Sequence, residues 1–220
     1  MMADPAPLPT IVVLASGSGT NLQALIDASR ERGFPGEILA VGCNRPGAFA
    51  LERAAQANLK TFVLDHTNYG SREEFDGALL ARLREFNPDL IVLAGFMRIL
   101  TSDFVRAFRG RILNVHPSLL PAYTGLNTHQ RVLDAGEAVH GVSIHFVTEE
   151  LDGGPVIAQA EIRVQAGDTA ETLSERVQQQ EHQLYPIVVR WFCEGRVQLA
   201  AEGVLFDGQP LEQPLRLVAS

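Results

Sequence analysis

The 220-residue sequence predicts an α/β fold in which a doubly wound, mostly parallel sheet carries helices on both faces. Three observations support this prediction. Short apolar runs alternate with segments whose apolar residues recur at helical spacing, which is typical of βαβ units. The apolar runs of the first half are continuous, as expected for strands buried on both faces. From about residue 138 the pattern changes to longer strands and one long helix, which predicts an antiparallel C-terminal extension.

In the first half of the chain, strands and helices are expected to alternate regularly. The third helix has the best-marked start, because Ser71 with Glu74 three residues later is a capping box. Crossovers in such units are nearly always right-handed, which fixes the local topology. The predicted strands are 10–16, 37–44, 60–64, 88–96 and 110–115. The predicted helices between them are 22–32, 48–58, 71–86 and the short segment 102–108.

The second half is expected to begin with strands at 138–148 and 155–164, which the short segment EELDGG joins as an antiparallel pair. One long helix is predicted over 169–195. The residues that follow this helix are predicted to form a short hairpin or a tail.

We expect a single domain over residues 10–220, because no internal repeat, low-complexity segment or linker interrupts it. Its halves differ in pattern: 10–115 has the alternation of a nucleotide-binding fold, and 116–220 carries the C-terminal extension. Residues 1–9 contain no cationic region followed by an apolar stretch. They are therefore expected to be a disordered lead-in and not a signal peptide.

Composition and charge argue against nucleic-acid and membrane binding. The formal net charge is −8, whereas nucleic-acid binders usually carry a basic surface that neutralises phosphates. No apolar run reaches the ~18 residues that a membrane-spanning helix needs. Cys43 and Cys193 lie far apart and fit no metal-ligand spacing, so two reduced thiols are favoured over a disulfide. We expect a cytoplasmic protein that binds small molecules.

A glycine-rich turn, SGSGTN, follows the first predicted strand and opens the first helix. Gly17 and Gly19 match the first two glycines of the dinucleotide fingerprint, but Leu22 stands at the third position. The second strand ends in Asn44 and not in the acidic residue that usually holds the ribose. Arg45 could accommodate a 2′-phosphate, so NADP stays open as a less favoured ligand.

The same turn fits a single phosphate monoester better than a dinucleotide. Backbone N–H groups and the helix dipole favour an anion at a helix N-terminus. Gly19 allows the backbone to approach the ligand closely, and Thr20 and Asn21 add side-chain donors. The alternative is a tight strand-to-helix turn that binds no ligand.

A second polar group lies at the end of the strand 110–115, in the stretch NVHPSLLPAYTG. Asn114 and His116 are two positions apart, so their side chains point to the same face of the strand. Ligands of open α/β sheets bind beyond the carboxyl ends of the strands. The loop TEELDGGPV adds Asp152, whose neighbours Gly153 and Gly154 permit unusual backbone angles.

These residue types suit the direct attack of a substrate nucleophile on a carbonyl carbon. The sequence has no GxSxG elbow, and neither cysteine occupies a marked turn, so covalent catalysis is not indicated. His116 is expected to carry the proton, and a nearby carboxylate such as Asp152 favours the charged form of an imidazole. The Asn114 amide is expected to donate to the developing oxyanion.

The remaining histidines have no spacing that indicates a metal site. His66, His129, His140 and His182 fit no HExxH or similar pattern. His145 is expected to be a core or supporting histidine and not a catalytic one. The sequence therefore predicts no metal.

Five stretches are similar, in unbroken order over about residues 10 to 195, to successive motifs of the folate-dependent formyltransferases. The Asn-x-His-Pro-Ser-Leu-Leu-Pro and Leu-Asp-x-Gly-Pro motifs belong to the whole superfamily. The glycine loop and RVQQQEH are more specific to its phosphoribosylglycinamide formyltransferases. The five stretches are SGSGTNLQALI, LAGFMRIL, NVHPSLLPAYTGL, HFVTEELDGGPVI and RVQQQEHQLYP.

The resemblance implies formyl transfer from 10-formyltetrahydrofolate to the amine of 5-phosphoribosylglycinamide in purine biosynthesis, with no metal. It implies that Asn114, His116 and Asp152 are the catalytic residues and that 116–220 holds the folate site. The implied contacts to the substrate phosphate and ribose are Gly19, Thr20, Asn21, Gln178, Gln179, Gln180 and Glu181. The implied folate contacts are Arg72, Met97, Arg98, Ile99, Leu100, Asn114, Thr148, Glu149, Glu150, Leu151 and Asp152.

The sequence departs from the family pattern at Ala122, Thr124 and Asn127, where relatives often carry a basic residue, a proline and a histidine. Any role of those positions in acid–base chemistry or loop stiffness is therefore in doubt here. Another folate-dependent formyltransferase or a formyltetrahydrofolate hydrolase is the nearest alternative. An NADP-dependent oxidoreductase or a nucleotide-binding module is more remote. The expected oligomeric state is a monomer or a homodimer.

Overall fold

The structure is a computed structural model that describes residues 7–217. The predicted disordered lead-in therefore lies outside the described residues over positions 1–6. Of its last three positions, Pro9 is tied to the fold, because its carbonyl accepts a hydrogen bond of 2.9 Å from the backbone N–H of Glu37.

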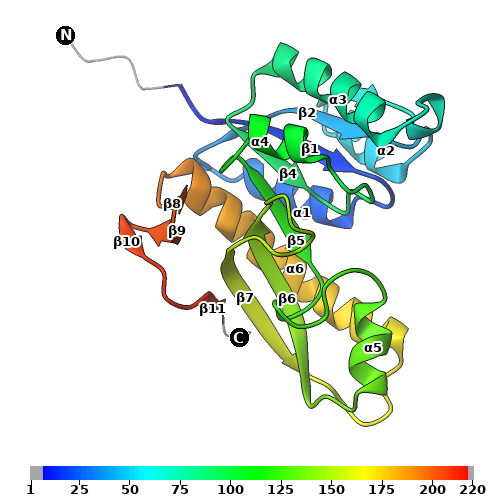
Figure 1. Cartoon of the computed structure of the whole chain (residues 1–220), viewed down its shortest axis with the longest axis vertical. Helices are drawn as coiled ribbons and strands as arrows, with labels where there is room; N and C mark the ends of the chain where they lie inside the picture. The colour runs from blue at the N-terminus through cyan, green and yellow to red at the C-terminus, as the bar shows by residue number, and fades with distance from the viewer. Residues whose placement is uncertain (1–6, 218–220) are drawn as a thin grey trace.

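One large sheet forms the centre of the molecule (Figure 1). Its strands are β1 (Thr10–Ala15), β2 (Glu37–Cys43), β3 (Lys60–Val63), β4 (Leu90–Leu93), β5 (Ile112–His116), β6 (Val139–Phe146), β7 (Val156–Arg163) and β11 (Leu215–Leu217). They lie in the order β11-β7-β6-β5-β4-β1-β2-β3. Strands β1 to β5 pair in parallel, while β6 pairs antiparallel with both β5 and β7. The predicted mostly parallel sheet is confirmed.

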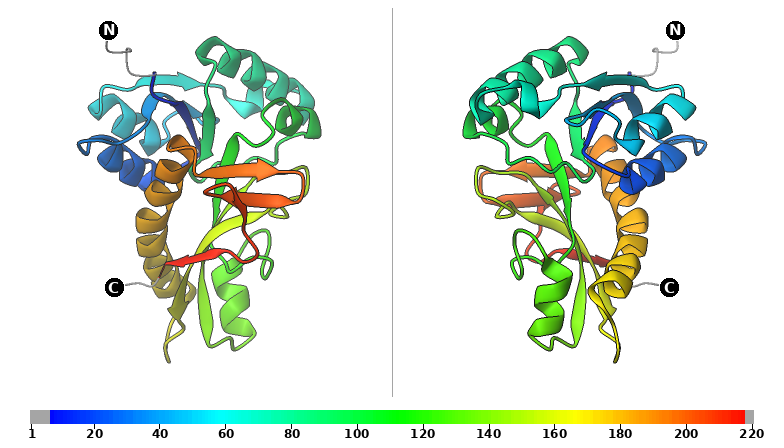
Figure 2. Two further views of the ribbon diagram at one scale, coloured as in Figure 1. Left: turned by 90° about the vertical axis from the view of Figure 1, so that its left-hand side faces the viewer. Right: turned by 90° about the vertical axis from the view of Figure 1, so that its right-hand side faces the viewer.

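Helices cover both faces of this sheet (Figure 2). They are α1 (Thr20–Ser29), α2 (Phe49–Gln56), α3 (Arg72–Phe86), α4 (Ser102–Ala107), α5 (Thr128–Asp134), α6 (Ala170–Cys193) and the 3-10 turn η1 (His66–Asn68). Ile11 and Val13 of β1 face a core that contains residues of α1, α2 and α6. Val12 and Leu14 face the opposite core, which α3 and α4 complete. The alternation along β1 explains why that strand reads as a continuous apolar run.

The C-terminal segment forms more than the predicted hairpin. The hairpin consists of β8 (Val197–Ala200) and β9 (Gly203–Phe206), and β10 (Gln209–Pro210) adds a third strand to this small sheet. The chain then returns to the large sheet as β11, which pairs in parallel with β7. Sequence reasoning did not predict β11, α5 or η1, since each is too short to carry a clear periodic signal.

The helix caps correct one detail of the prediction. Ser71 accepts a hydrogen bond from the N–H of Glu74 at 3.1 Å, as expected of an N-cap. Glu74, however, accepts from the N–H of Gly70 at 2.8 Å and not from that of Ser71, so the reciprocal capping box is wrong. A complete capping box is found instead at α6, between Thr169 and Thr172.

Helix α6 is anchored to the middle of the sheet by one buried phenol. The hydroxyl of Tyr185 lies 3.1 Å from the carbonyl oxygen of Leu93 and 2.9 Å from that of Leu113. A single proton can serve only one of these acceptors at a time. This contact fixes the height of α6 relative to the carboxyl ends of β4 and β5, where the predicted site residues lie.

Candidate active site

The pairing of β5 with β6 sets the orientation of the Asn114 amide. Asn114 lies opposite His145 in the strand register, and its Nδ2 is 3.1 Å from Nε2 of that ring. Nδ1 of His145 lies 2.9 Å from the carbonyl oxygen of Phe146 and must donate to it. Burial lowers the pKa of His145, which favours a neutral ring whose Nε2 accepts from Asn114. The second N–H of the amide is left for another partner.

The structure brings His116 and Asp152 together, which the sequence alone did not establish. Nδ1 of His116 lies 3.5 Å from Oδ2 of Asp152, and their side chains are only 7% and 9% exposed. The same oxygen accepts from the N–H of Gly125 at 2.8 Å. Nε2 of His116 lies 2.9 Å from the carbonyl oxygen of Tyr123. Each ring nitrogen of His116 thus faces an oxygen atom that can accept a hydrogen bond.

The loop between β6 and β7 carries Asp152 back toward β5 by a tight bend. Asp152 itself has a φ of 52°, a left-handed conformation that aspartate tolerates better than most residues. Gly154 passes so close to Phe146 that an added Cβ would lie 1.8 Å from its carbonyl oxygen. A glycine at position 154 is therefore needed for this path of the backbone.

A buried polar network fixes the loop that follows His116. The Ser143 hydroxyl donates to the carbonyl of Ser118 at 2.7 Å and accepts from the N–H of Leu120 at 3.0 Å. Gln159 donates to the same hydroxyl and to the carbonyl of Leu120, both at 2.9 Å. Satisfied buried networks of this kind specify one conformation. Sequence reasoning missed Ser143 and Gln159, because only the β5–β6–β7 register reveals that they face this loop.

The glycine loop leads from β1 into α1, and Asn21 at the start of α1 links this helix to α6. Gly19 has a φ of 70°, and an added Cβ would lie 2.8 Å from Cα of Ala50, so glycine is required there. Nδ2 of Asn21 donates to Oε2 of Glu181 at 2.7 Å. Burial raises the pKa of Glu181, and the hydrogen bond from Asn21 opposes this shift. Oδ1 of Asn21 is buried and has no hydrogen-bond partner among residues 7–217.

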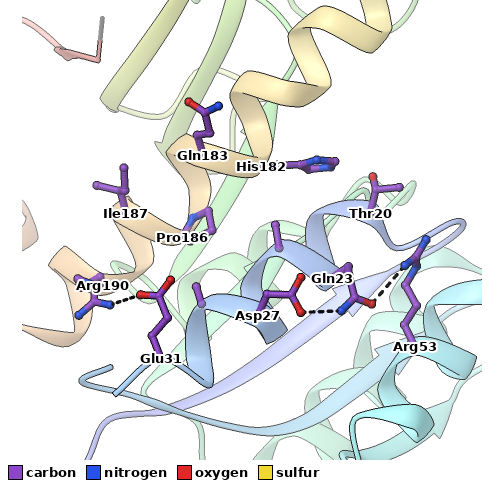
Figure 3. A pocket seen from close by; sticks show the side chains of 12 residues that line it. Thr20, Gln23, Asp27, Glu31, Arg53, His182, Gln183, Pro186, Ile187 and Arg190 are labelled. Carbon is purple, nitrogen blue, oxygen red and sulfur yellow. Dashed lines mark hydrogen bonds and ion pairs between the residues drawn. The ribbon is translucent and has the colours of Figure 1, made fainter. Parts of the chain in front are cut away.

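The other predicted ribonucleotide contacts lie nearby but differ in exposure. Thr20 lines a cavity of about 740 Å³ between α1 and α6 (Figure 3). Gln178 and Gln180 are half-buried on α6, whereas Gln179 is exposed. Of the four predicted positions on α6, Glu181 makes the hydrogen bond to the glycine loop.

The predicted folate contacts that follow β4 are held at both ends of their loop. The Ser16 hydroxyl accepts from the N–H of Met97 at 2.7 Å. Asp76 accepts from the N–H of Thr101 at 2.5 Å. Burial raises the pKa of Asp76 in opposition to this hydrogen bond. The backbone between Met97 and Thr101 is therefore fixed by Ser16, which directly follows β1, and by Asp76 of α3.

The side chains of the predicted folate contacts present apolar groups to solvent. Met97, Ile99 and Leu151 are exposed, as is common at ligand-binding grooves. Glu149 is held elsewhere, because Arg106 of α4 donates to its two oxygens at 2.9 and 2.7 Å and lowers its pKa. Among the remaining predicted contacts, Arg98, Leu100 and Thr148 are half-buried and Arg72 and Glu150 are exposed.

The cysteines are not suited to nucleophilic chemistry. Cys43 and Cys193 are both buried and unpaired, in agreement with the prediction of reduced thiols. Burial raises the pKa of Cys43 to about 11 and that of Cys193 to about 12. Across residues 7–217, no three His, Cys, Asp or Glu side chains are grouped to hold a metal ion. The helices of the same region include none with the length and hydropathy to span a bilayer.

Comparison with known proteins identifies the family. The family model described as formyl transferase matches residues 10–189. The chain belongs to the formyl transferase family. Phosphoribosylglycinamide formyltransferase of Escherichia coli (strain K12) is 50% identical over 201 residues, which are 91% of this chain and 95% of that protein. The resemblance read from the motifs is confirmed, and this formyl transferase is an enzyme of the phosphoribosylglycinamide formyltransferase group.

Two further relatives extend the comparison. Trifunctional purine biosynthetic protein adenosine-3 of Gallus gallus is 48% identical over 193 residues, 88% of this formyl transferase but 19% of that protein. The solved structure of phosphoribosylglycinamide formyltransferase from Coxiella burnetii has a TM-score of 0.90 at 48% identity. The matched region covers 96% of this chain and 99% of the Coxiella burnetii chain. The predicted fold class is therefore confirmed by a structural relative as well.

Proposed function

We propose that the protein transfers the formyl group of 10-formyltetrahydrofolate to the amine of 5-phosphoribosylglycinamide, a step of de novo purine biosynthesis. The names of its relatives support the reaction and the pathway. The observation that carries the proposal is the cluster of Asn114, His116 and Asp152 at the carboxyl end of β5. Such a cluster suits attack on a carbonyl and offers no covalent nucleophile.

In this proposal, the Asn114 amide stabilises the charge that develops on the formyl oxygen. One N–H of the amide is used by His145, and the second is available to the oxyanion. A positioned donor of this kind contributes about 3–4 kcal/mol in comparable sites. 10-Formyltetrahydrofolate supplies the formyl group when bound, and the protein itself supplies no metal to the reaction in this proposal.

His116 is proposed to balance the proton transfers. The new C–N bond forms between the substrate amine and the formyl carbon, and the bond from that carbon to the folate nitrogen breaks. His116 gives a proton to the leaving nitrogen and receives the proton that the amine loses. We assign this exchange to Nε2, where the reacting atoms replace the Tyr123 carbonyl as partner. Asp152 holds the other nitrogen and compensates the positive charge of the ring.

The two substrates are proposed to lie on opposite sides of this cluster. The phosphate would lie at the glycine loop Gly19–Thr20–Asn21, with Glu181 accepting from the ribose hydroxyls. The folate would lie along 97–100 and 148–152, where exposed apolar side chains suit a flat heterocycle. A cytoplasmic location and a monomeric or homodimeric state are part of the same proposal.

The test is a formyl-transfer assay with the purified protein, 5-phosphoribosylglycinamide and 10-formyltetrahydrofolate. We expect formyl-phosphoribosylglycinamide and tetrahydrofolate in equal amounts. A parallel reaction without the amine substrate measures hydrolysis of the formyl folate, which the alternative hydrolase function requires. Rapid release of formate without the amine, or no product with it, would overturn the proposal.

A further inference from the structure

The predicted ribonucleotide site lacks a cation, although its substrate carries a phosphate. Thr20 and Asn21 are neutral, and Glu181 is acidic. A phosphate monoester has a charge of about −1.5 to −2 at pH 7. Backbone N–H groups and a helix dipole compensate only part of such a charge. A basic side chain is therefore expected near the glycine loop. The one arginine in the two motifs of this site, Arg176, is held in an ion pair by Asp168 at 2.7 Å.

The structure brings Arg53 of α2 to this loop. Ala50 packs against Gly19, and its N–H donates to the carbonyl of Gly17 at 3.0 Å. Arg53 lies three residues further along α2 and hence on the same face of the helix. Its Nε donates to the carbonyl of Ser18 at 2.8 Å. The guanidinium group is thus attached to the backbone of the glycine loop.

Two other contacts fix the plane of this guanidinium group. Nη1 donates to Oε1 of Gln23 at 3.2 Å, and Asp27 in turn holds the amide of Gln23 at 2.9 Å. Phe49 lies beneath the guanidinium carbon at 4.8 Å from the ring centre. Within residues 7–217 no carboxylate forms an ion pair with Arg53, so its charge remains for a ligand.

Arg53 shares the end of the α1–α6 cavity with two other polar side chains. Figure 3 shows Arg53, Thr20 of α1 and His182 of α6 around the same opening. Nε2 of His182 is buried and has no partner among the described residues. Three helices therefore direct polar groups to one place beside the glycine loop.

We propose that Arg53 is the cation of the phosphate subsite and determines the preference for a phosphorylated substrate. This inference rests on the proposed function. The guanidinium group keeps its bond to Ser18 and offers its remaining N–H groups to a phosphate oxygen beside Thr20. Arg53 stabilises the bound ribonucleotide and takes no part in the formyl transfer itself.

Arg30 provides a matched control for a merely structural role. Like Arg53, it joins α1 to α2, since its Nη2 donates to the carbonyl of Ala57 at 3.3 Å. It lies after the last residue of α1, at the end opposite the glycine loop. If arginines between these helices act only by holding them together, Arg30→Gln and Arg53→Gln should behave alike.

The decisive measurement compares two amine substrates, the ribonucleotide and the same molecule without its 5′-phosphate. For Arg53→Gln we expect kcat/KM with the ribonucleotide to fall about tenfold to hundredfold, as for a lost charge-assisted hydrogen bond. With the dephosphorylated substrate, kcat/KM should stay within about twofold of wild type, as should KM for the folate. Arg53→Lys should recover part of the discrimination, and Arg30→Gln should leave it unchanged.

Equal losses with both substrates, or an unchanged ratio in a folded Arg53→Gln protein, would overturn the inference. Calorimetric titration with ribose 5-phosphate in the absence of folate gives a second measurement that needs no turnover. Weaker binding by Arg53→Gln than by Arg30→Gln supports the inference, and equal binding contradicts it. If wild type binds ribose 5-phosphate but transfers no formyl group, the proposed function fails while the phosphate subsite is still tested.

Discussion

At the scale of single residues, the hydrogen bonds around Asn114 determine which of its amide atoms can meet a ligand. The neutral His145 ring accepts one N–H, because its other nitrogen is committed to a backbone carbonyl. The amide cannot flip without losing that bond. His145 is therefore a positioning residue for Asn114 under the proposed mechanism.

Replacing His116 by alanine should leave the fold intact and remove most turnover. The reason is that the proton lost by the amine then has no carrier, and positioned acid–base groups contribute about 10²–10⁴-fold to rates. Circular dichroism and the formyl-transfer assay measure the two effects. Near wild-type turnover in a folded His116→Ala protein would contradict the proposed role.

Replacing Glu181 by glutamine should weaken ribonucleotide binding and, at the same time, stabilise the fold at pH 7. Loss of the charged acceptor should weaken ribonucleotide binding about tenfold or more, while folate binding stays close to that of wild type. Burial raises the pKa of Glu181 above its value in the unfolded chain. The contribution of this side chain to stability is therefore fully present below the unfolded pKa, and it is lost as pH rises through the folded pKa. The Glu181→Gln protein should therefore be more stable than wild type at pH 7.

Calorimetric titration of each ligand and urea denaturation at pH 7 check these two expectations for Glu181. If Glu181→Gln weakened binding of the folate alone, the assignment of α6 to the ribonucleotide site would be wrong. A lower free energy of unfolding for Glu181→Gln at pH 7 would show that the buried carboxylate is better compensated than its surroundings indicate.

At the scale of elements, the loop between β5 and α5 depends on side chains from β6 and β7. Ser143 and Gln159 hold the backbone of this loop at Ser118 and Leu120. The loop in turn supplies the Tyr123 carbonyl and the Gly125 N–H to the His116–Asp152 pair. The antiparallel strands therefore support the cluster as well as extend the sheet.

Replacing Ser143 by alanine should lower both stability and turnover. The N–H groups of Leu120 and Gln159 then lose a buried acceptor, which costs about 1–3 kcal/mol. Urea denaturation measures the stability, and the formyl-transfer assay measures kcat. Thr128, the first residue of α5, provides a comparison, because its hydroxyl holds the same loop by donating to the Pro117 carbonyl at 2.7 Å. If Ser143→Ala were as stable and as active as wild type, the network would not be needed to hold the loop.

Periodicity in the sequence was sufficient to predict β1 to β7 and helices α1, α2, α3, α4 and α6, because each carries a clear apolar pattern. It was insufficient for α5 and β11, whose seven and three residues are held by tertiary contacts. For the candidate site, the spacing in NVHPS predicted that Asn114 and His116 share a face. The contact with Asp152 and the approach of Arg53 depend on chain reversals that no local pattern encodes.

At the scale of the whole molecule, buried histidines make stability depend on pH. His140 is buried on β6, and Nδ1 of His129 on α5 lies 3.0 Å from its Nε2. Burial, with smaller contributions from His129 and His116, lowers the pKa of His140 to about 4. In the unfolded chain the ring takes up a proton at about pH 6.5. The free energy of unfolding should therefore fall as pH decreases from about 6.5 to 4, since the unfolded state then binds more protons.

Substitution of His140 by glutamine should make this fall shallower, by up to ~1.4 kcal/mol per pH unit. Urea denaturation of both proteins at several pH values between 7 and 4.5 measures the slope, which is independent of any constant loss of stability in the variant. The other buried histidines are common to both proteins. Parallel curves would show that His140 does not contribute to the pH dependence.

The pairing of β11 with β7 also affects the tendency of the protein to aggregate with its own copies. Without β11, the backbone groups of β7 from Ala158 to Ala160 would form a free sheet edge, which is a template for strands of other chains. A three-residue strand covers that edge and offers few free groups of its own. Across the pair, Arg216 donates to Glu161 at 2.9 Å and adds charge to the border. Strand β11 thus protects the edge of β7 from pairing with strands of other chains.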